Sequence, residues 1–256
     1  MADSVVKKEQ QQVATLDFSM VEADSGLGNK EVDQDTLSIP FLKTNLSKQI
    51  LEANRGAVSG DMYNTVTGEI YDRDKGVLVL PCVFQRRFIQ WSPLGDEQSA
   101  PIAIYSTKEE CPATERSKED NKEYLTDGSG HYIEDTHQHF VLVIDKDGTA
   151  QPALIAMKST QLKKSRKWNS MVQGRMATGK DGRPFQMPRF SHVYSLKSVK
   201  EENSKGAWHG WDIALDKQVD DVSVYGQAKQ FAQSIQAGDV NVKHSQDDEN
   251  SGEVPF

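Results

Sequence analysis

The chain has 256 residues, of which 36% are hydrophobic and 27% are charged, and its formal net charge is −8. This length and composition predict one elaborated domain with room for unstructured segments. No apolar run approaches the roughly 20 residues needed to cross a bilayer, the first residues lack a hydrophobic signal segment, and two cysteines do not form a disulfide framework. We therefore expect a soluble, cytoplasmic protein with reduced thiols and no membrane association.

The first part of the chain predicts a flexible start followed by β structure. Residues 1–36 are polar and acidic, without periodicity, and are expected to form a flexible arm. A short helix is predicted over residues 46–53, capped by Asn45 or Ser47, and a hairpin over residues 62–71. The strongest strand signal covers Val77–Trp91, with a break or bulge near Pro81. Residues 92–137, rich in proline, glycine and charge, predict a long insertion with one strand near residues 102–105.

The second part predicts four more strands and two helices. Strands over residues 139–144 and 153–158 flank a turn at residues 145–148. A helix capped by Ser159 or Thr160 runs to about Met176, and a loop over residues 174–188 leads to strands at residues 190–199 and 208–215. An amphipathic helix covers residues 222–237 and ends at Gly238. Residues 37–238 would then form the domain, and residues 239–256 a disordered acidic tail.

This element order predicts the fold class. Five strands with one helix between the third and the fourth is the order of an OB-fold, a small Greek-key barrel that commonly binds oligonucleotides. The prediction is a mainly β protein with two helices: an OB-fold-like five-stranded barrel with a long insertion and disordered acidic termini.

Positive charge is concentrated in residues 158–200. This stretch contains eleven lysines and arginines and a single acid, Asp181, so its net charge is +10 within an acidic chain. A localised positive field suits a polyanion, and the interleaved aromatic residues could stack on bases. The alternative is a solvated helix face followed by an ordinary strand.

Several residues are candidate contacts to single-stranded DNA. On the strand over Val77–Trp91, either face places an arginine beside aromatic side chains, so one exposed arginine with core aromatics remains an alternative. Trp211 is predicted in the core, whereas Trp208 is out of phase and is predicted to stack on a base. The predicted contacts are Arg86, Arg87, Lys158, Lys163, Lys164, Arg166, Lys167, Trp168, Arg175, Lys180, Arg183, Phe185, Arg189, Tyr194 and Trp208.

No motif indicates catalysis or a cofactor. The sequence has no Walker A motif, no G-x-S-x-G and no H-E-x-x-H, so the protein is predicted not to be an enzyme. Four residues in or beside the insertion suit zinc by type, but their spacing matches no standard finger, and the prediction is that no metal binds. They are Cys111, His131, His137 and His139.

The C-terminus combines acidic residues with an apolar end. A phenylalanine ring and free carboxylate preceded by acids form a portable ligand for a partner protein, and the same segment can compete with DNA for the basic surface. A terminus without a role is the alternative. The predicted partner-binding residues are Asp247, Asp248, Glu249, Glu253, Val254, Pro255 and Phe256.

This ending resembles the acidic tip of bacterial single-stranded DNA-binding proteins, which ends Asp-Asp-Ile-Pro-Phe. In that family the tip recruits replication and repair enzymes. Here Asn250, Ser251 and Gly252 interrupt the acids.

Other segments resemble a group of bacteriophage proteins described as single-stranded DNA-binding. The likeness is carried by residues 61–71, Val77–Trp91 and residues 157–165 with Trp168 and Asn169, and it spans most of residues 61–215. It implies an OB-fold and a role in phage DNA replication or recombination.

The functional hypothesis is a sequence-nonspecific single-stranded DNA-binding protein, acting in the infected host cell and recruiting replication or recombination proteins through its tail. The alternative is a phage structural or assembly protein that docks its basic stretch on an acidic subunit. A third hypothesis is a general DNA-packaging or architectural protein. Oligomeric state, homo-oligomers included, and preference for DNA over RNA stay open.

Overall fold

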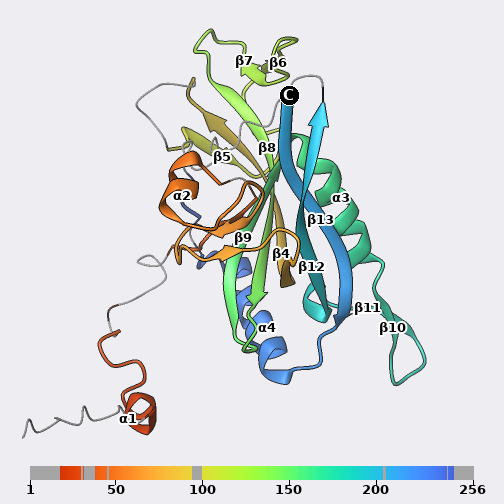
Figure 1. Ribbon diagram of the computed structural model, residues 1–256. Helices are drawn as coiled ribbons and strands as arrows, with labels where there is room; N and C mark the ends of the chain where they lie inside the picture. The colour runs from red at the N-terminus through yellow and green to blue at the C-terminus, as the bar shows by residue number, and fades with distance from the viewer. Residues whose placement is uncertain are drawn as a thin grey trace, which may run out of the picture.

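The computed structural model describes residues 18–29, 31, 38–44, 46–93, 100–203, 206–240 and 242–244. In these residues the protein is mainly β, with a curled antiparallel sheet and four α-helices (Figure 1). The helices are α1 (Phe18–Ala23), α2 (Lys48–Ala53), α3 (Leu162–Gln173) and α4 (Val222–Ala237), with single 3-10 turns η1 (Ser159–Gln161) and η2 (Arg189–Ser191).

The strands form one large sheet and two small ones. The large sheet contains β4 (Val77–Trp91), β5 (Ala103–Tyr105), β6 (Thr114–Arg116), β7 (Glu123–Leu125), β8 (Tyr132–Ile144), β9 (Ala150–Lys158), β12 (His192–Asn203) and β13 (Gly206–Gln218). The small sheets are β1 (Leu42–Lys43), β2 (Met62–Asn64) and β3 (Ile70–Tyr71), and a hairpin of β10 (Met176–Thr178) and β11 (Pro184–Gln186).

Two long strands, β4 and β8, organise the large sheet. They pair antiparallel from Leu78 opposite Ile144 to Trp91 opposite Tyr132. The first part of β4 also pairs with β12, which pairs with β13, while β8 also pairs with β9. No pairing between β9 and β13 is found, although both strands lie wholly within the described residues. The sheet is therefore a half-barrel, and a closed five-stranded OB barrel is not confirmed.

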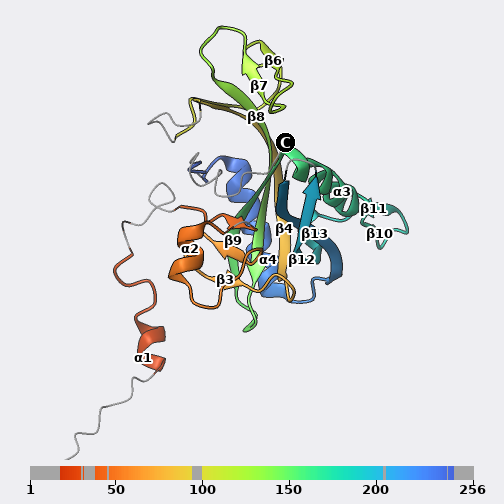
Figure 2. The same cartoon turned by 45° about the horizontal axis from the view of Figure 1, so that its top comes forward.

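Opposite faces of this sheet bury two separate cores. Because side chains alternate along a strand, Val79 contributes to one core and Leu80 to the other. Trp168 and Val172 of α3 pack into the first core. Helix α4 packs Ala228, Ala232 and Ile235 into the second. The two helices thus cover opposite faces of the curled sheet (Figures 1 and 2).

Several predicted elements are confirmed. Strand β4 and helix α4 have the predicted bounds, and Gly238 ends α4 with a left-handed φ of 85°. Ser47 caps α2 by accepting a hydrogen bond from the amide of Ile50. The predicted bulge is also present, since the register of β4 against β8 shifts between Pro81 and Val83.

Other predictions are corrected. Strand β8 begins at Tyr132 rather than residue 139, and the preceding insertion contains β5, β6 and β7 instead of one strand. The predicted loop over residues 174–188 contains the β10–β11 hairpin. In the described part of the chain, no side-chain hydrogen bond caps the start of η1 or α3, so neither Ser159 nor Thr160 is the predicted cap. The N-terminal arm includes α1, and the strands on both sides of residues 204–205 extend further than predicted.

Three residues of the predicted disordered tail, Val240, Val242 and His244, contact the fold. Val240 and Val242 pack against the second core, and His244 is buried. Nε2 of His244 lies 2.8 Å from the side-chain amide nitrogen of Gln138, and the His244 ring contacts the ring of Phe41 edge-on. These tertiary contacts hold a segment whose local sequence is polar. Residues 245–256, with the predicted partner-binding residues, lie outside the described residues.

Candidate nucleic-acid interface

Helix α3 presents a row of cations to solvent. Its buried positions, Ser165, Trp168 and Val172, follow helical spacing and face the sheet. The opposite side exposes three predicted contacts, for which no ion pair is found with any carboxylate that the structure describes. We call these residues the α3 ridge: Lys163, Arg166 and Lys167.

The β10–β11 hairpin continues this basic surface. It follows α3 directly and projects from the body beside the end of that helix (Figures 1 and 2). Lys180 and Arg183 are exposed, and Arg183 forms a solvent-exposed pair with Asp181 at 3.8 Å. The side chain of Gln186 donates a hydrogen bond to Gln173 in the last turn of α3. The ridge and the hairpin are therefore linked into one surface.

Four other predicted cations are held by neighbouring residues. Acids that lie far along the sequence pair with three of them. The fourth, Arg87, donates to the side chain of Gln85 and to the carbonyl of Arg86. The pairs are Arg86 with Asp135 at 2.7 Å, Lys158 with Glu134 at 3.1 Å, and Lys164 with Glu201 at 2.9 Å. Local sequence could not show these partners, because strand pairing and helix packing bring them together.

Most of the predicted stacking rings are buried. Trp168 and Tyr194 are 0% exposed and contact each other in the first core, so neither presents a face to a base. Trp208 is 9% exposed, and its indole N–H donates to Glu201 at 3.0 Å. These three predictions are corrected, whereas the prediction that Trp211 lies in the core is confirmed. Phe185 on the hairpin is 47% exposed and accessible.

Arg175 and Arg189 support the fold beneath the surface. Arg175 is half-buried and donates from Nε to the carbonyl of Met171. Arg189 donates from Nη2 to Oδ1 of Asn169 at 2.7 Å and to Nδ1 of His139 at 3.1 Å. Burial lowers the pKa of Arg189 to about 10. Both side chains therefore bind protein atoms instead of facing outward as predicted.

The four residues considered for zinc do not surround a common point. His137 and His139 both contact the hydroxyl of Ser165, and His131 contacts the side chain of Gln90. The thiol of Cys111 donates to the carbonyl of Thr107. In the part of the chain that the structure describes, no group of three or more His, Cys, Asp or Glu side chains is placed to hold a metal ion.

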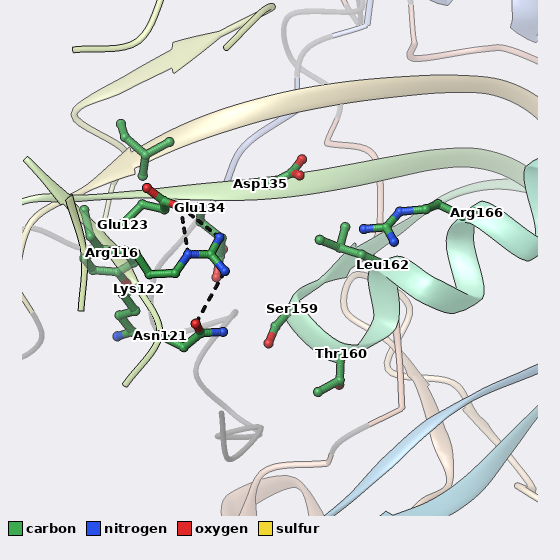
Figure 3. A pocket seen from close by; sticks show the side chains of 12 residues that line it. Arg116, Asn121, Lys122, Glu123, Glu134, Asp135, Ser159, Thr160, Leu162 and Arg166 are labelled. Carbon is green, nitrogen blue, oxygen red and sulfur yellow. Dashed lines mark hydrogen bonds and ion pairs between the residues drawn. The ribbon is translucent and has the colours of Figure 1, made fainter. Parts of the chain in front are cut away.

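A pocket of about 430 Å³ lies at the start of α3, between η1 and the β6–β7 hairpin (Figure 3). Arg116 and Asn121 line it on one side, and Ser159 and Thr160 face them from η1. Its three carboxylates are all paired: Glu123 with Arg116, Glu134 with Lys158, and Asp135 with Arg86. Arg166 lines the same pocket, so the pocket opens onto the α3 ridge.

The geometry defines a mainly β protein whose exposed basic helix and hairpin could bind a polyanion. No helix in the described residues is both long and apolar enough to span a membrane.

A comparison with protein-family models identifies the family of this chain. The chain belongs to the Pam3 phage gp34-like protein family, whose model matches residues 7–241, and it is thus a phage protein. Neither the curated proteins nor the solved structures provide a match.

Proposed function

We propose that this phage protein binds single-stranded DNA without sequence specificity and without catalysis, in phage replication or recombination inside the infected cell. The observation that carries the proposal is the continuous surface formed by the α3 ridge and the β10–β11 hairpin. It presents cations that pair with no buried carboxylate in the described part of the chain, and beside them lies an accessible aromatic ring, Phe185. Cations for phosphates and a ring for bases are the components of a single-strand site.

The order of the long strands supports an OB-fold-like architecture as part of this proposal. Strands β4, β8, β9, β12 and β13 occur with α3 between the third and the fourth, the order expected for an OB-fold. Single-stranded DNA would follow the outer side of α3 from the pocket toward the hairpin. Phosphates would contact the ridge, and a base would stack on Phe185.

The C-terminal residues would recruit partners. Acidic residues ending in Val254, Pro255 and Phe256 suit a basic, apolar recognition pocket on a replication or recombination protein. Deletion of residues 247–256 is expected to preserve or tighten DNA binding and to abolish partner recruitment. Unchanged partner capture after this deletion would contradict the role of the tail.

A charge-matched pair of variants tests DNA binding. The ridge variant combines K163Q, R166Q and K167Q, and its control combines K48Q, K146Q and K229Q, which are exposed lysines outside the interface. Binding of a fluorescein-labelled oligo-dT is measured by anisotropy across a salt series. Quenching of tryptophan fluorescence is unsuited, because all four tryptophans are buried. The ridge variant should lower the slope of log Kobs against log salt by about 2, since each lost phosphate contact contributes roughly 0.7.

The outcomes separate this function from its rivals. The control should bind like the wild type, so equal losses in both variants would mean that only total charge matters. Equal affinity for duplex DNA would favour an architectural protein. No binding of oligo-dT at low salt would overturn the proposal and favour docking on an acidic phage subunit.

A further inference from the structure

A chain of hydrogen bonds runs beneath the α3 ridge. Arg189 Nη2 lies 3.1 Å from His139 Nδ1, and His139 Nε2 lies 2.7 Å from Ser165 Oγ. The same hydroxyl lies 2.7 Å from His137 Nδ1. His137 Nε2 then faces Oδ1 of Asp135 at 4.0 Å. We call the four residues from Arg189 to His137 the Ser165 chain.

The donors in this chain can be assigned. Arginine only donates, so His139 Nδ1 must accept and a neutral His139 carries its proton on Nε2. That N–H donates to Ser165 Oγ, and the serine hydroxyl is then free to donate to Nδ1 of His137. In this arrangement His137 carries its proton on Nε2, toward Asp135. Protonation of His139 at Nδ1 would set that N–H against the N–H of Arg189 and break the chain, whereas a proton on Nδ1 of His137 would only reverse its hydrogen bond, because the Ser165 oxygen can accept two.

The surroundings favour the neutral form of both imidazoles. His139 is fully buried and stacks on Trp168 with ring centroids 4.5 Å apart, and burial together with Arg189 and His137 holds its pKa well below the usual range. Burial also lowers the pKa of His137. Asp135 opposes that shift, whereas Arg86 and Arg166 reinforce it.

The Ser165 chain joins helix α3 to strand β8 and to η2, which follows the hairpin. Ser165 and Asn169 lie one turn apart on the inner side of α3, opposite the ridge. Both histidines belong to β8, and Arg189 begins η2, three residues after the hairpin ends. Arg189 bonds Asn169 as well as His139, so a single side chain connects helix, sheet and hairpin base.

We propose that Ser165, His137, His139 and Arg189 are positioning residues for DNA binding: their hydrogen-bond chain fixes α3 and the hairpin in register only while His139 is neutral. Acidification would favour the release of α3 from β8, because the released imidazoles bind protons that the buried ones do not, and would lower the affinity for single-stranded DNA without protonating any residue of the ridge. This inference rests on the proposed function.

A pair of serine variants tests the positioning role. Ser165→Ala removes the centre of the chain. Its matched control is Ser198→Ala, a buried serine on β12 whose hydroxyl has no hydrogen-bond partner among the residues that the structure describes. Affinity for labelled oligo-dT is measured at pH 7.5 and pH 5.5. Ser165→Ala should weaken binding at pH 7.5 by roughly twofold to thirtyfold, the range for residues that act without ligand contact, and should show a smaller further loss at pH 5.5 than the wild type. Ser198→Ala should match the wild type at both values.

Hydrogen exchange of the wild type keeps the test independent of variant folding and of DNA. Amides of α3 should lose more protection than those of α4 between pH 7.5 and pH 5.5, after correction for the intrinsic rate, because the local release of α3 adds to the general loss of stability. Unchanged α3 protection, or a Ser165→Ala protein that binds DNA like the wild type, would overturn the inference. Loss of α3 protection in a wild type that binds no DNA would instead overturn the proposed function and leave the conformational role of the chain intact.

Discussion

Trp168 shows how a residue inside a basic segment can belong to the core. Lysines and arginines precede and follow it, yet helical spacing turns its ring toward the sheet. There it stacks on His139 and meets Tyr194 edge-on. Composition alone could not distinguish this ring from one that contacts a base.

Replacement of Trp168 should therefore affect stability. Trp168→Ala is expected to lower the free energy of unfolding by about 3–5 kcal/mol, because it leaves a cavity between α3 and the sheet. Urea denaturation followed by circular dichroism measures the loss. A loss below about 1 kcal/mol would contradict the core assignment.

Phe185 should behave in the opposite way. Its half-exposed ring on the hairpin contributes little to folding, but a stacked base is worth about 1–3 kcal/mol. Phe185→Ala and Phe185→Leu should both weaken oligo-dT binding by this amount, whereas Phe185→Trp should retain it. Thermal midpoints should stay close to that of the wild type. Full affinity in Phe185→Leu would show that apolar bulk, and not stacking, is sufficient.

At the scale of elements, the start of α3 is fixed by a second polar junction. Glu201 of β12 pairs with Lys164 and accepts hydrogen bonds from Gln161 and Trp208. Gln161 in turn accepts from the backbone amide of Trp211 on β13. The helix is thus joined to β12 and β13 at its start and to β8 through the Ser165 chain.

Gly210 makes room for this junction. A Cβ at this position would lie 2.6 Å from Nε2 of Gln161 and 2.7 Å from Oε2 of Glu201. Gly210→Ala should destabilise the protein by roughly 1–3 kcal/mol, since overpacking would displace buried hydrogen-bonding groups. Gly226→Ala is the control: it lies in α4 with open space around it, and should stabilise by about 0.5–1 kcal/mol. Chemical denaturation of both variants checks the two signs.

For the whole molecule, the buried histidines make stability depend on pH. The folded-state pKa values of His137 and His139 lie below the ordinary value of 6.5. Above pH 6.5 both imidazoles are neutral in the folded and unfolded states. Below it the unfolded chain binds more protons, so the free energy of unfolding falls as pH falls.

The expected slope is up to about 1.4 kcal/mol per pH unit for each histidine that stays neutral in the fold. Urea midpoints measured at pH 5.5, 6.5 and 7.5 test this. His139→Gln should be less stable at pH 7.5 and should show a smaller decline toward pH 5.5. A wild type with constant stability over this range would contradict the burial of neutral imidazoles.

Local patterns predicted elements whose signal is continuous. The β-branched and aromatic run of β4 and the amphipathic period of α4 define their bounds to the residue. The local pattern does not reveal the first half of β8, because Thr136, His137 and Gln138 are polar. They are nevertheless buried, since β4 and β9 flank them on both edges.

Local sequence patterns locate the five long strands, helices α3 and α4 and the concentration of positive charge in residues 158–200, because these depend on composition and on the spacing of near neighbours. The accessibility of these cations and rings depends on tertiary packing. Acids that pair with Lys158 and Lys164 lie far along the chain, and the burial of Trp168 and Tyr194 depends on how α3 packs against the sheet. Such contacts join residues distant in sequence, which local patterns do not encode.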